Sequence, residues 1–320
     1  MGQYLLRRVV LGAVTIWIVT MIVFTGLRVV VPLFYGDIVD LLTAEYGSGD
    51  PALKEQLREE YGLKVGVVEQ YGRWVGGMLT GDIGVSLRSG RSILLEVRQR
   101  LPVSLTLGLV GLTASVFIAV PMGITAALLQ NRWPDYALRM YAVGSSSVPS
   151  FWVAIMIIVF GSIWFRWAPP LHFAYLWEDP IAHIKIMLLP ALLIGLTPSG
   201  GLVRIMRGQM LEVLRQDYVR TARSKGLTER AVVLKHALRN ALIPIVTIIG
   251  LGLPGLVAGT ALFEIIFVLP GMGNYLVQAT NTLDYPVIQA INVTFALMIV
   301  TANTLVDMSY SFIDPRIRLR

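Results

Sequence analysis

The histidines are the first residues to test for chemistry, because imidazole serves as a metal ligand and as an acid or base near neutral pH. The chain has three, His172, His183 and His236, and they form no metal-ligand pair at helical spacing. His172 and His183 fall in a sparsely charged loop, where we expect solvated side chains. Cysteine is absent, which excludes thiolate metal sites and structural disulfides. The sequence therefore predicts no metal site on this chain.

Motifs for nucleotide binding and acyl transfer are also missing. Neither the phosphate-binding pattern G-x-x-x-x-G-K-[ST] nor the nucleophile pattern G-x-S-x-G occurs. We therefore expect no catalytic residue and no bound cofactor on this chain. Ionisable residues inside apolar runs, the usual sign of ion or proton coupling, are scarce. The main exceptions are Asp307, expected near an interface, and Glu264, for which a place along a pathway stays open. This scarcity favours an energy source outside the chain.

One strongly basic segment, RTARSKGLTERAVVLKHALRN at 220–240, lies between two apolar runs and contains a single acid, Glu229. Apolar residues before and after Gly226 recur at three- and four-residue spacing, which is typical of one helix face; these are Leu211, Leu214, Tyr218 and Ala222, then Ala231, Leu234, Ala237 and Leu238. Gly226 suits a helix end, and Thr228 suits the N-cap of the next helix. We expect two short amphipathic helices around a glycine bend. Two roles stay open: membrane orientation with lipid binding, or a docking surface for a protein.

The elements that must position this segment are membrane helices. Hydrophobic residues make up 55% of the 320 residues and charged residues 15%, whereas soluble domains have about 45–50% and about 25%. Six apolar runs are each long enough to cross about 30 Å of hydrocarbon as a helix; they span 9–27, 103–129, 138–164, 186–205, 241–263 and 287–312. We read the first run as a retained helix, because no small-residue cleavage site follows it. The predicted fold is an all-α integral membrane protein with six transmembrane helices.

The charge distribution predicts the orientation. Residues 204–239 include nine basic and three acidic residues, and the chain ends and the loop near 132–139 are also basic. The positive-inside rule then places both termini in the cytoplasm. Because topology accounts for the net charge of +7, we expect no nucleic-acid partner. In the long outer segment, Asp50 suits an N-cap before Pro51 and Gly62 a helix stop, so a small helical cap is predicted. The alternative is a poorly ordered connection.

At this point the sequence resembles a family. Thr221-Ala222, then Gly226, then a basic helix ending at Pro244 resembles the EAA loop of ABC-importer permeases. Longer stretches are similar to the dipeptide/oligopeptide subgroup; they are DYVRTARSKGL (217–227), HALRNALIP (236–244), PGMG (270–273), DYP (284–286) and DPRIR (314–318). Two positions depart from the motif, since Thr221 replaces its first alanine and Arg220 stands where its acid is usual. The subgroup's compact Pro-Gly-Asp-Pro turn is also altered, to PLFYGDI at 32–38.

The resemblance implies a MetI-like permease core at 102–320, with a coupling loop at 206–240. An N-terminal tip and first helix would occupy 1–32, and an extracytoplasmic helical segment 33–101. The chain would be a non-enzymatic subunit of an ATP-driven importer in a prokaryotic inner membrane, forming the path for di- or oligopeptides. Its partners would be a second related permease, two cytoplasmic ATPases that bind ATP and Mg²⁺, an extracytoplasmic binding protein and the lipid bilayer. The coupling residues implied are Arg220, Thr221, Ala222, Gly226, Leu227 and Pro244.

Other functions remain as alternatives. Relatives resembling this subgroup move nickel complexes, glutathione or oligosaccharides, and the sequence assigns no substrate-binding residue. An ion-coupled carrier or channel acting alone would need inverted repeats and intramembrane charges, and neither is evident. A membrane-anchored assembly protein would use the basic loop only as a scaffold.

Overall fold

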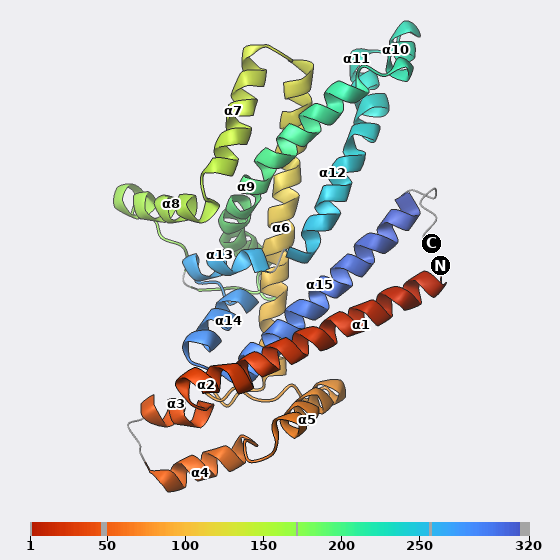
Figure 1. The fold of residues 1–320 in the computed structure, drawn as a ribbon. Helices are drawn as coiled ribbons and strands as arrows, with labels where there is room; N and C mark the ends of the chain where they lie inside the picture. The colour runs from red at the N-terminus through yellow and green to blue at the C-terminus, as the bar shows by residue number, and fades with distance from the viewer. Residues whose placement is uncertain (1, 46–49, 171, 256–257, 314–320) are drawn as a thin grey trace. The chain divides into compact units, whose positions relative to one another are not determined.

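The regular structure of the chain is helical, as predicted. The computed structural model describes residues 2–45, 50–170, 172–255 and 258–313, and within these ranges the extended pairing is limited to an isolated bridge between Val85 and Ser92 (Figure 1). The Cα atoms cluster into two compact units. The first unit is Met1–Leu101 with Tyr275–Arg320, and the second is Pro102–Asn274.

Among the described residues, five helical segments are long and apolar enough to cross a membrane, and a bent pair makes a sixth if it counts as one span. The segments are Leu6–Phe34, Ile93–Leu128, Pro180–Val213, Glu229–Gly252 and Tyr285–Val306. They are built from α1 (Gly2–Thr25), a π-helical turn (Gly26–Val30), α2 (Val31–Tyr35), α6 (Ile93–Leu128), α9 (Pro180–Val213), α11 (Glu229–Ala231), a second π-helical turn (Val232–Ala237), α12 (Leu238–Gly252) and α15 (Tyr285–Ile313). The predicted multi-pass architecture is confirmed.

Two predicted runs depart most from the structure. The run at 138–164 is broken, because α7 (Trp133–Ser147) and α8 (Ser150–Phe165) meet at 92°. Val148 is extended (φ −99°, ψ 123°), the conformation that the following Pro149 favours. The run at 241–263 also differs, since its helix begins at Glu229 and ends at Gly252. Pro254 lies in the short 3₁₀ turn that follows, and it has no N–H to continue a helix.

In the first unit, α1 and α15 pack along each other (Figure 1). Their close approach depends on Gly12, where an added Cβ would lie 2.6 Å from Cγ1 of Val300. The segment that follows contains α3 (Ile38–Glu45), α4 (Pro51–Glu60) and α5 (Val67–Thr80), so it is helical as predicted. Asp50 caps α4 as expected, because its Oδ1 accepts from the N–H of Ala52 at 2.9 Å.

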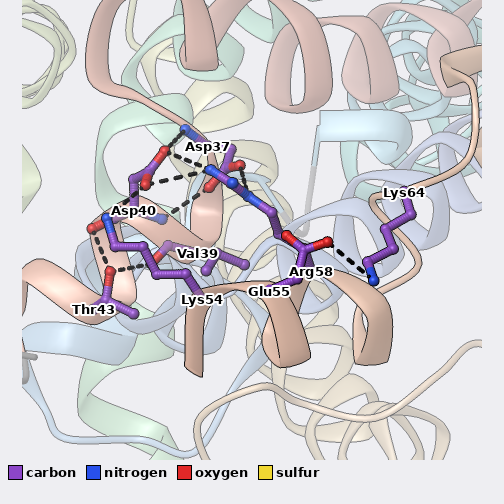
Figure 2. Close-up of polar contacts among 8 residues, drawn as sticks. All are labelled: Asp37, Val39, Asp40, Thr43, Lys54, Glu55, Arg58 and Lys64. Atoms are coloured by element: carbon purple, nitrogen blue, oxygen red, sulfur yellow. Dashed lines mark hydrogen bonds and ion pairs between the residues drawn. The ribbon is translucent and has the colours of Figure 1, made fainter. Parts of the chain in front are cut away.

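A polar cluster joins α3 to α4 (Figure 2). Asp37 caps α3 reciprocally with Asp40: the Asp40 N–H donates to Asp37 at 2.8 Å and the Asp37 N–H donates to Asp40 at 3.3 Å. From α4, Lys54 Nζ reaches Asp40 at 2.9 Å and Arg58 Nε reaches Asp37 at 2.8 Å. The altered 32–38 stretch therefore ends in a capping box rather than in a compact proline turn.

The loop before α6 is held by one buried carboxylate of the first unit. Asp284 is 3% exposed and accepts from Ser86 Oγ at 2.6 Å and from the N–H of Leu87 at 3.2 Å. These contacts tie residues 86–87 to the residue just before α15.

In the second unit, α7 packs on α9 and α9 packs on α12. Gly200 leaves room for Ala142 and Ser145 of α7, which agrees with the close packing expected of small residues. A buried ion pair reinforces this contact. Asp135 is 0% exposed and accepts from Arg207 Nε at 2.7 Å and Nη2 at 2.8 Å.

Candidate functional site

The basic segment forms a bend between two helices, as predicted. After α9 ends at Val213, a turn leads into α10 (Asp217–Ser224), and the chain reverses at Gly226, whose φ is +77°. Thr228 then caps the next helix, since its Oγ1 accepts from the N–H of Ala231 at 3.4 Å. A left-handed residue at this point needs glycine because a Cβ would make the backbone conformation costly.

The second helix differs from the prediction. It is not a short separate helix but runs without a break from Glu229 to Gly252, so it is the first part of a membrane segment. The stretch Val232–Ala237 is π-helical, which widens the turn and shifts the apolar face. For this reason Leu234, expected on the buried face, is 48% exposed.

Small apolar side chains hold the hairpin closed. Val219 and Ala222 on α10 are buried in one core cluster with Val232, Val233 and Ala237. Tyr218 was expected on this face but is 42% exposed, and Val219 takes its place. The Tyr218 hydroxyl instead accepts from Asn240 Nδ2 at 2.7 Å, so it still links the two helices.

An ion pair crosses the bend, and sequence reasoning did not find it. Arg223 donates from Nη2 to Glu229 Oε1 at 2.6 Å and from Nε to Oε2 at 3.1 Å. The signal was present, because Glu229 is the single acid of the segment and follows the bend directly. This two-point contact spans the bend between α10 and α11, although both side chains are partly exposed and the pair contributes little to stability.

The predicted site residues occupy three different environments. Arg220, Thr221, Gly226 and Leu227 lie on the exposed side of the hairpin, and Leu227 is 42% exposed. Ala222 is buried beneath them, 5% exposed. Pro244 lies inside α12, about 22 Å along the helix from Glu229 at 1.5 Å per residue. The structure therefore brings five of the six together and leaves Pro244 outside the surface.

The exposed side of the hairpin is basic. The exposed Lys and Arg side chains of this region are Arg215, Arg220, Arg223, Lys225, Arg230, Lys235 and Arg239. Two acids nearby, Asp217 and Glu229, contact Arg220 at 3.6 Å and Arg223 at 2.6 Å. Such a surface, with an apolar side chain at its tip, suits docking to a complementary acidic groove.

In the part of the chain that the structure describes, no group of three His, Asp or Glu side chains is arranged to hold a metal ion. His172 is exposed as expected, but His183 is 3% exposed, so that prediction was wrong. Its Nδ1 donates to the carbonyl of Ala174 at 2.9 Å, because α9 begins three residues earlier and packs its first turn on this loop.

Glu264 does not line an open path. It is 0% exposed and accepts from Ser104 Oγ at 2.6 Å, Thr260 Oγ1 at 2.6 Å and the N–H of Asn274 at 2.9 Å. The side chain of Asp307 lies outside the described residues. The sequence pattern does not single out another charge, Arg28, because the predicted first apolar run ends at Leu27, one residue before it.

Comparison with known proteins agrees with this architecture. Residues 119–319 match the family described as binding-protein-dependent transport system inner membrane component. The chain is 34% identical to the oligopeptide transport system permease protein AppB of Bacillus subtilis, and 35% identical to the dipeptide transport system permease protein DppB of Escherichia coli (strain K12). Each comparison covers 99% of both chains.

Proposed function

The chain belongs to the family of binding-protein-dependent transport system inner membrane components, and on that premise we propose that it is the permease subunit of an ATP-driven importer for di- or oligopeptides. It forms part of the path through the membrane and carries out no catalysis itself. ATP and Mg²⁺ bind to two partner ATPases. The names of its full-length relatives support the peptide substrate, ahead of nickel, glutathione or oligosaccharides.

The hairpin is the proposed coupling element. Its exposed basic side, with Arg220, Thr221 and Leu227, sits in a groove of a cytoplasmic ATPase. Closing of the ATPase pair moves α10, and the continuous helix from Glu229 to Gly252 carries this movement into the membrane as a rigid body. This continuity is the single observation that carries the proposal, because a helix transmits displacement where a flexible loop does not. Pro244 would act within the moving helix and not at the docking surface.

The surrounding assembly is also part of the proposal. A second related permease pairs with this chain, and an extracytoplasmic binding protein delivers the peptide. Both termini lie in the cytoplasm, which follows from the basic loops. The functional parts are 1–32, 33–101 and 102–320, with the coupling loop at 206–240. Their bounds differ from those of the two compact units, because α15 belongs to the third part but packs on α1 in the first unit.

The test replaces Gly226 in the complete transporter. Gly226→Val puts a β-branched side chain at φ +77°, at a cost of about 1–2 kcal/mol or more, which the hairpin relieves by changing its angle. We expect membrane insertion at the parent level, peptide uptake into proteoliposomes at least about 10-fold lower, and ATP hydrolysis that no longer responds to the loaded binding protein. Nothing lies within 4 Å of the added Cβ, so the effect comes from the backbone and not from a clash.

Gly226→Asn is the matched control, because asparagine tolerates the left-handed region better than other residues with a Cβ. It should retain most of the uptake. Parent-level uptake by the valine variant, at equal expression, would contradict the coupling role.

A further inference from the structure

Arg28 is a cation near the C-terminal end of the first membrane segment, in an unusual piece of helix. It lies in the first membrane segment, Leu6–Phe34, where the turn Gly26–Val30 is π-helical. Ionisable residues within membrane segments are costly and mark functional sites by default. π-helical turns inside α-helices also occur frequently at functional sites. Two independent features therefore single out this position.

Buried donors near Arg28 lack acceptors. Within the described residues, Arg28 Nε and Nη1 are buried without a hydrogen-bond partner, and so is Nε2 of Gln289 on α15. Gln289 is 2% exposed. Leaving a buried donor unsatisfied is destabilising, and more so for a charged group. Three such donors together point to a missing acceptor.

Arg28 and Gln289 both line one cavity of about 360 Å³, formed within the first unit. Its apolar walls are Phe24, Trp74, Ile83, Val85, Leu87 and Pro286. The Phe24 and Trp74 rings are stacked with centroids 5.8 Å apart, so one wall of the cavity is aromatic. The size falls in the range of small-molecule sites, about 300–1,000 Å³.

The other charged groups of this cavity already have partners. Arg73 donates to Glu69 at 2.6 Å, and Asp82 accepts from the N–H of Gly84 at 3.0 Å. Arg28 is thus the cation of this cavity with unsatisfied donors, and the carboxylate of Asp37, which is paired with Arg58, is an anion that interacts with its charge. By contrast, the larger groove along α8, about 730 Å³, is lined by apolar and aromatic residues and has no charged side chain to orient a ligand.

We propose that this cavity binds the C-terminal end of a peptide, with the carboxylate on Arg28 and Gln289 and the neighbouring apolar side chain against Phe24 and Trp74. The assignment rests on the proposed peptide function. A carboxylate supplies the acceptors that the guanidinium and amide donors lack, and charge-assisted hydrogen bonds are the strong ones. The aromatic wall adds apolar burial and selects against small hydrophilic anions.

The experiment uses the purified full-length chain in nanodiscs of phosphatidylcholine, with binding followed by ligand-observed NMR. The probes are the dipeptide Ala-Phe and its C-terminal amide. We expect saturable binding of Ala-Phe and at least about 10-fold weaker binding of the amide, since the amide removes the charge that Arg28 recognises. Equal binding of the two probes, or binding of neither, overturns the proposal.

Variants locate the site. Arg28→Gln should weaken Ala-Phe binding at least about 10-fold. Gln289→Glu keeps the side-chain shape and adds a negative charge, so it should weaken binding even if Arg28→Gln does not fold. Arg98→Gln removes the same charge from an exposed position on α6 outside the cavity and should bind as the parent. Unchanged binding in well-folded Gln289→Glu overturns the proposal.

A lipid headgroup offers a similar anion. Nanodiscs with phosphatidylglycerol distinguish this source, because a lipid occupant would block Ala-Phe and stabilise the parent but not Arg28→Gln. That result overturns the peptide assignment. A failed binding test is distinguishable from failure of the proposed function. The complete transporter could still import peptide with ATP even if the isolated permease bound no peptide at Arg28.

Discussion

Replacing Glu264 by alanine tests the buried polar network of the second unit. The Glu264 carboxylate accepts from two hydroxyls and one backbone N–H, and Ser104 Oγ in turn accepts from the N–H of Met272 at 2.8 Å. The network therefore joins α6 to α13 (Ala261–Ile266) and to the start of α14 (Met272–Asn281). Removing the carboxylate takes the acceptor from two buried hydroxyls and one part-buried backbone N–H at once.

The cost follows from these contacts. Each buried donor that loses its acceptor costs about 1–3 kcal/mol, but the hydroxyls of Ser104 and Thr260 can rotate toward other acceptors. We expect Glu264→Ala to lower the free energy of unfolding by about 3–5 kcal/mol. Glu264→Gln keeps one carbonyl oxygen for the Asn274 N–H and should cost about 1 kcal/mol.

Thermal unfolding of the purified chain in detergent, followed by tryptophan fluorescence, measures the difference. The alanine variant should melt about 5–15 °C lower than the parent. Glu212→Ala, an exposed glutamate of α9, is the control and should change little. A loss below about 1 kcal/mol in Glu264→Ala, or equal losses in the alanine and glutamine variants, would refute the reasoning. Peptide uptake retained by Glu264→Gln would also exclude a proton-coupling role for this carboxylate.

Two further predictions concern ion pairs. Asp135→Ala leaves Arg207 unpaired where α7 packs on α9, and it should lower the free energy of unfolding by about 3–5 kcal/mol in the same melt. The double variant Asp135→Leu with Arg207→Met should recover at least half of that loss. A loss near zero in Asp135→Ala would show that solvent replaces the pair. The hydrogen bond from Lys54, aided by the charge of Arg58, holds the pKa of Asp40 below its ordinary value of 3.8. The stabilisation that Asp40 provides is therefore fully present above pH 3.8, and it is lost as the pH falls through the lower pKa of the folded state. Protease cleavage between α3 and α4 should therefore rise on acidification in the parent, while Asp40→Asn, cleaved more readily at neutral pH, should show a smaller rise; equal rises would contradict the assignment.

The sequence by itself determined the class of the protein and the bend. Apolar runs long enough to cross a bilayer require helices because backbone groups there have no water to bind, so composition and run length suffice. The bend at Gly226 and the helix start at Thr228 depend only on nearby residues. Positive φ favours glycine, and the N-cap side chain accepts from a backbone N–H three residues later. Such features depend on neighbours in the chain and can be predicted without the fold.

Only the tertiary structure decided which polar groups meet. Arg207 and Asp135 are 72 residues apart in the sequence, and Ser104 and Glu264 are 160 residues apart. No local sequence pattern therefore predicts either contact. The continuity of the helix beyond Glu229 and the burial of Val219 in place of Tyr218 also depend on packing. Beyond the bend, the π-helical turn at Val232–Ala237 interrupts the regular 3.6-residue pattern. Sequence spacing identifies a helix face, but the partner that covers that face is set by distant parts of the chain.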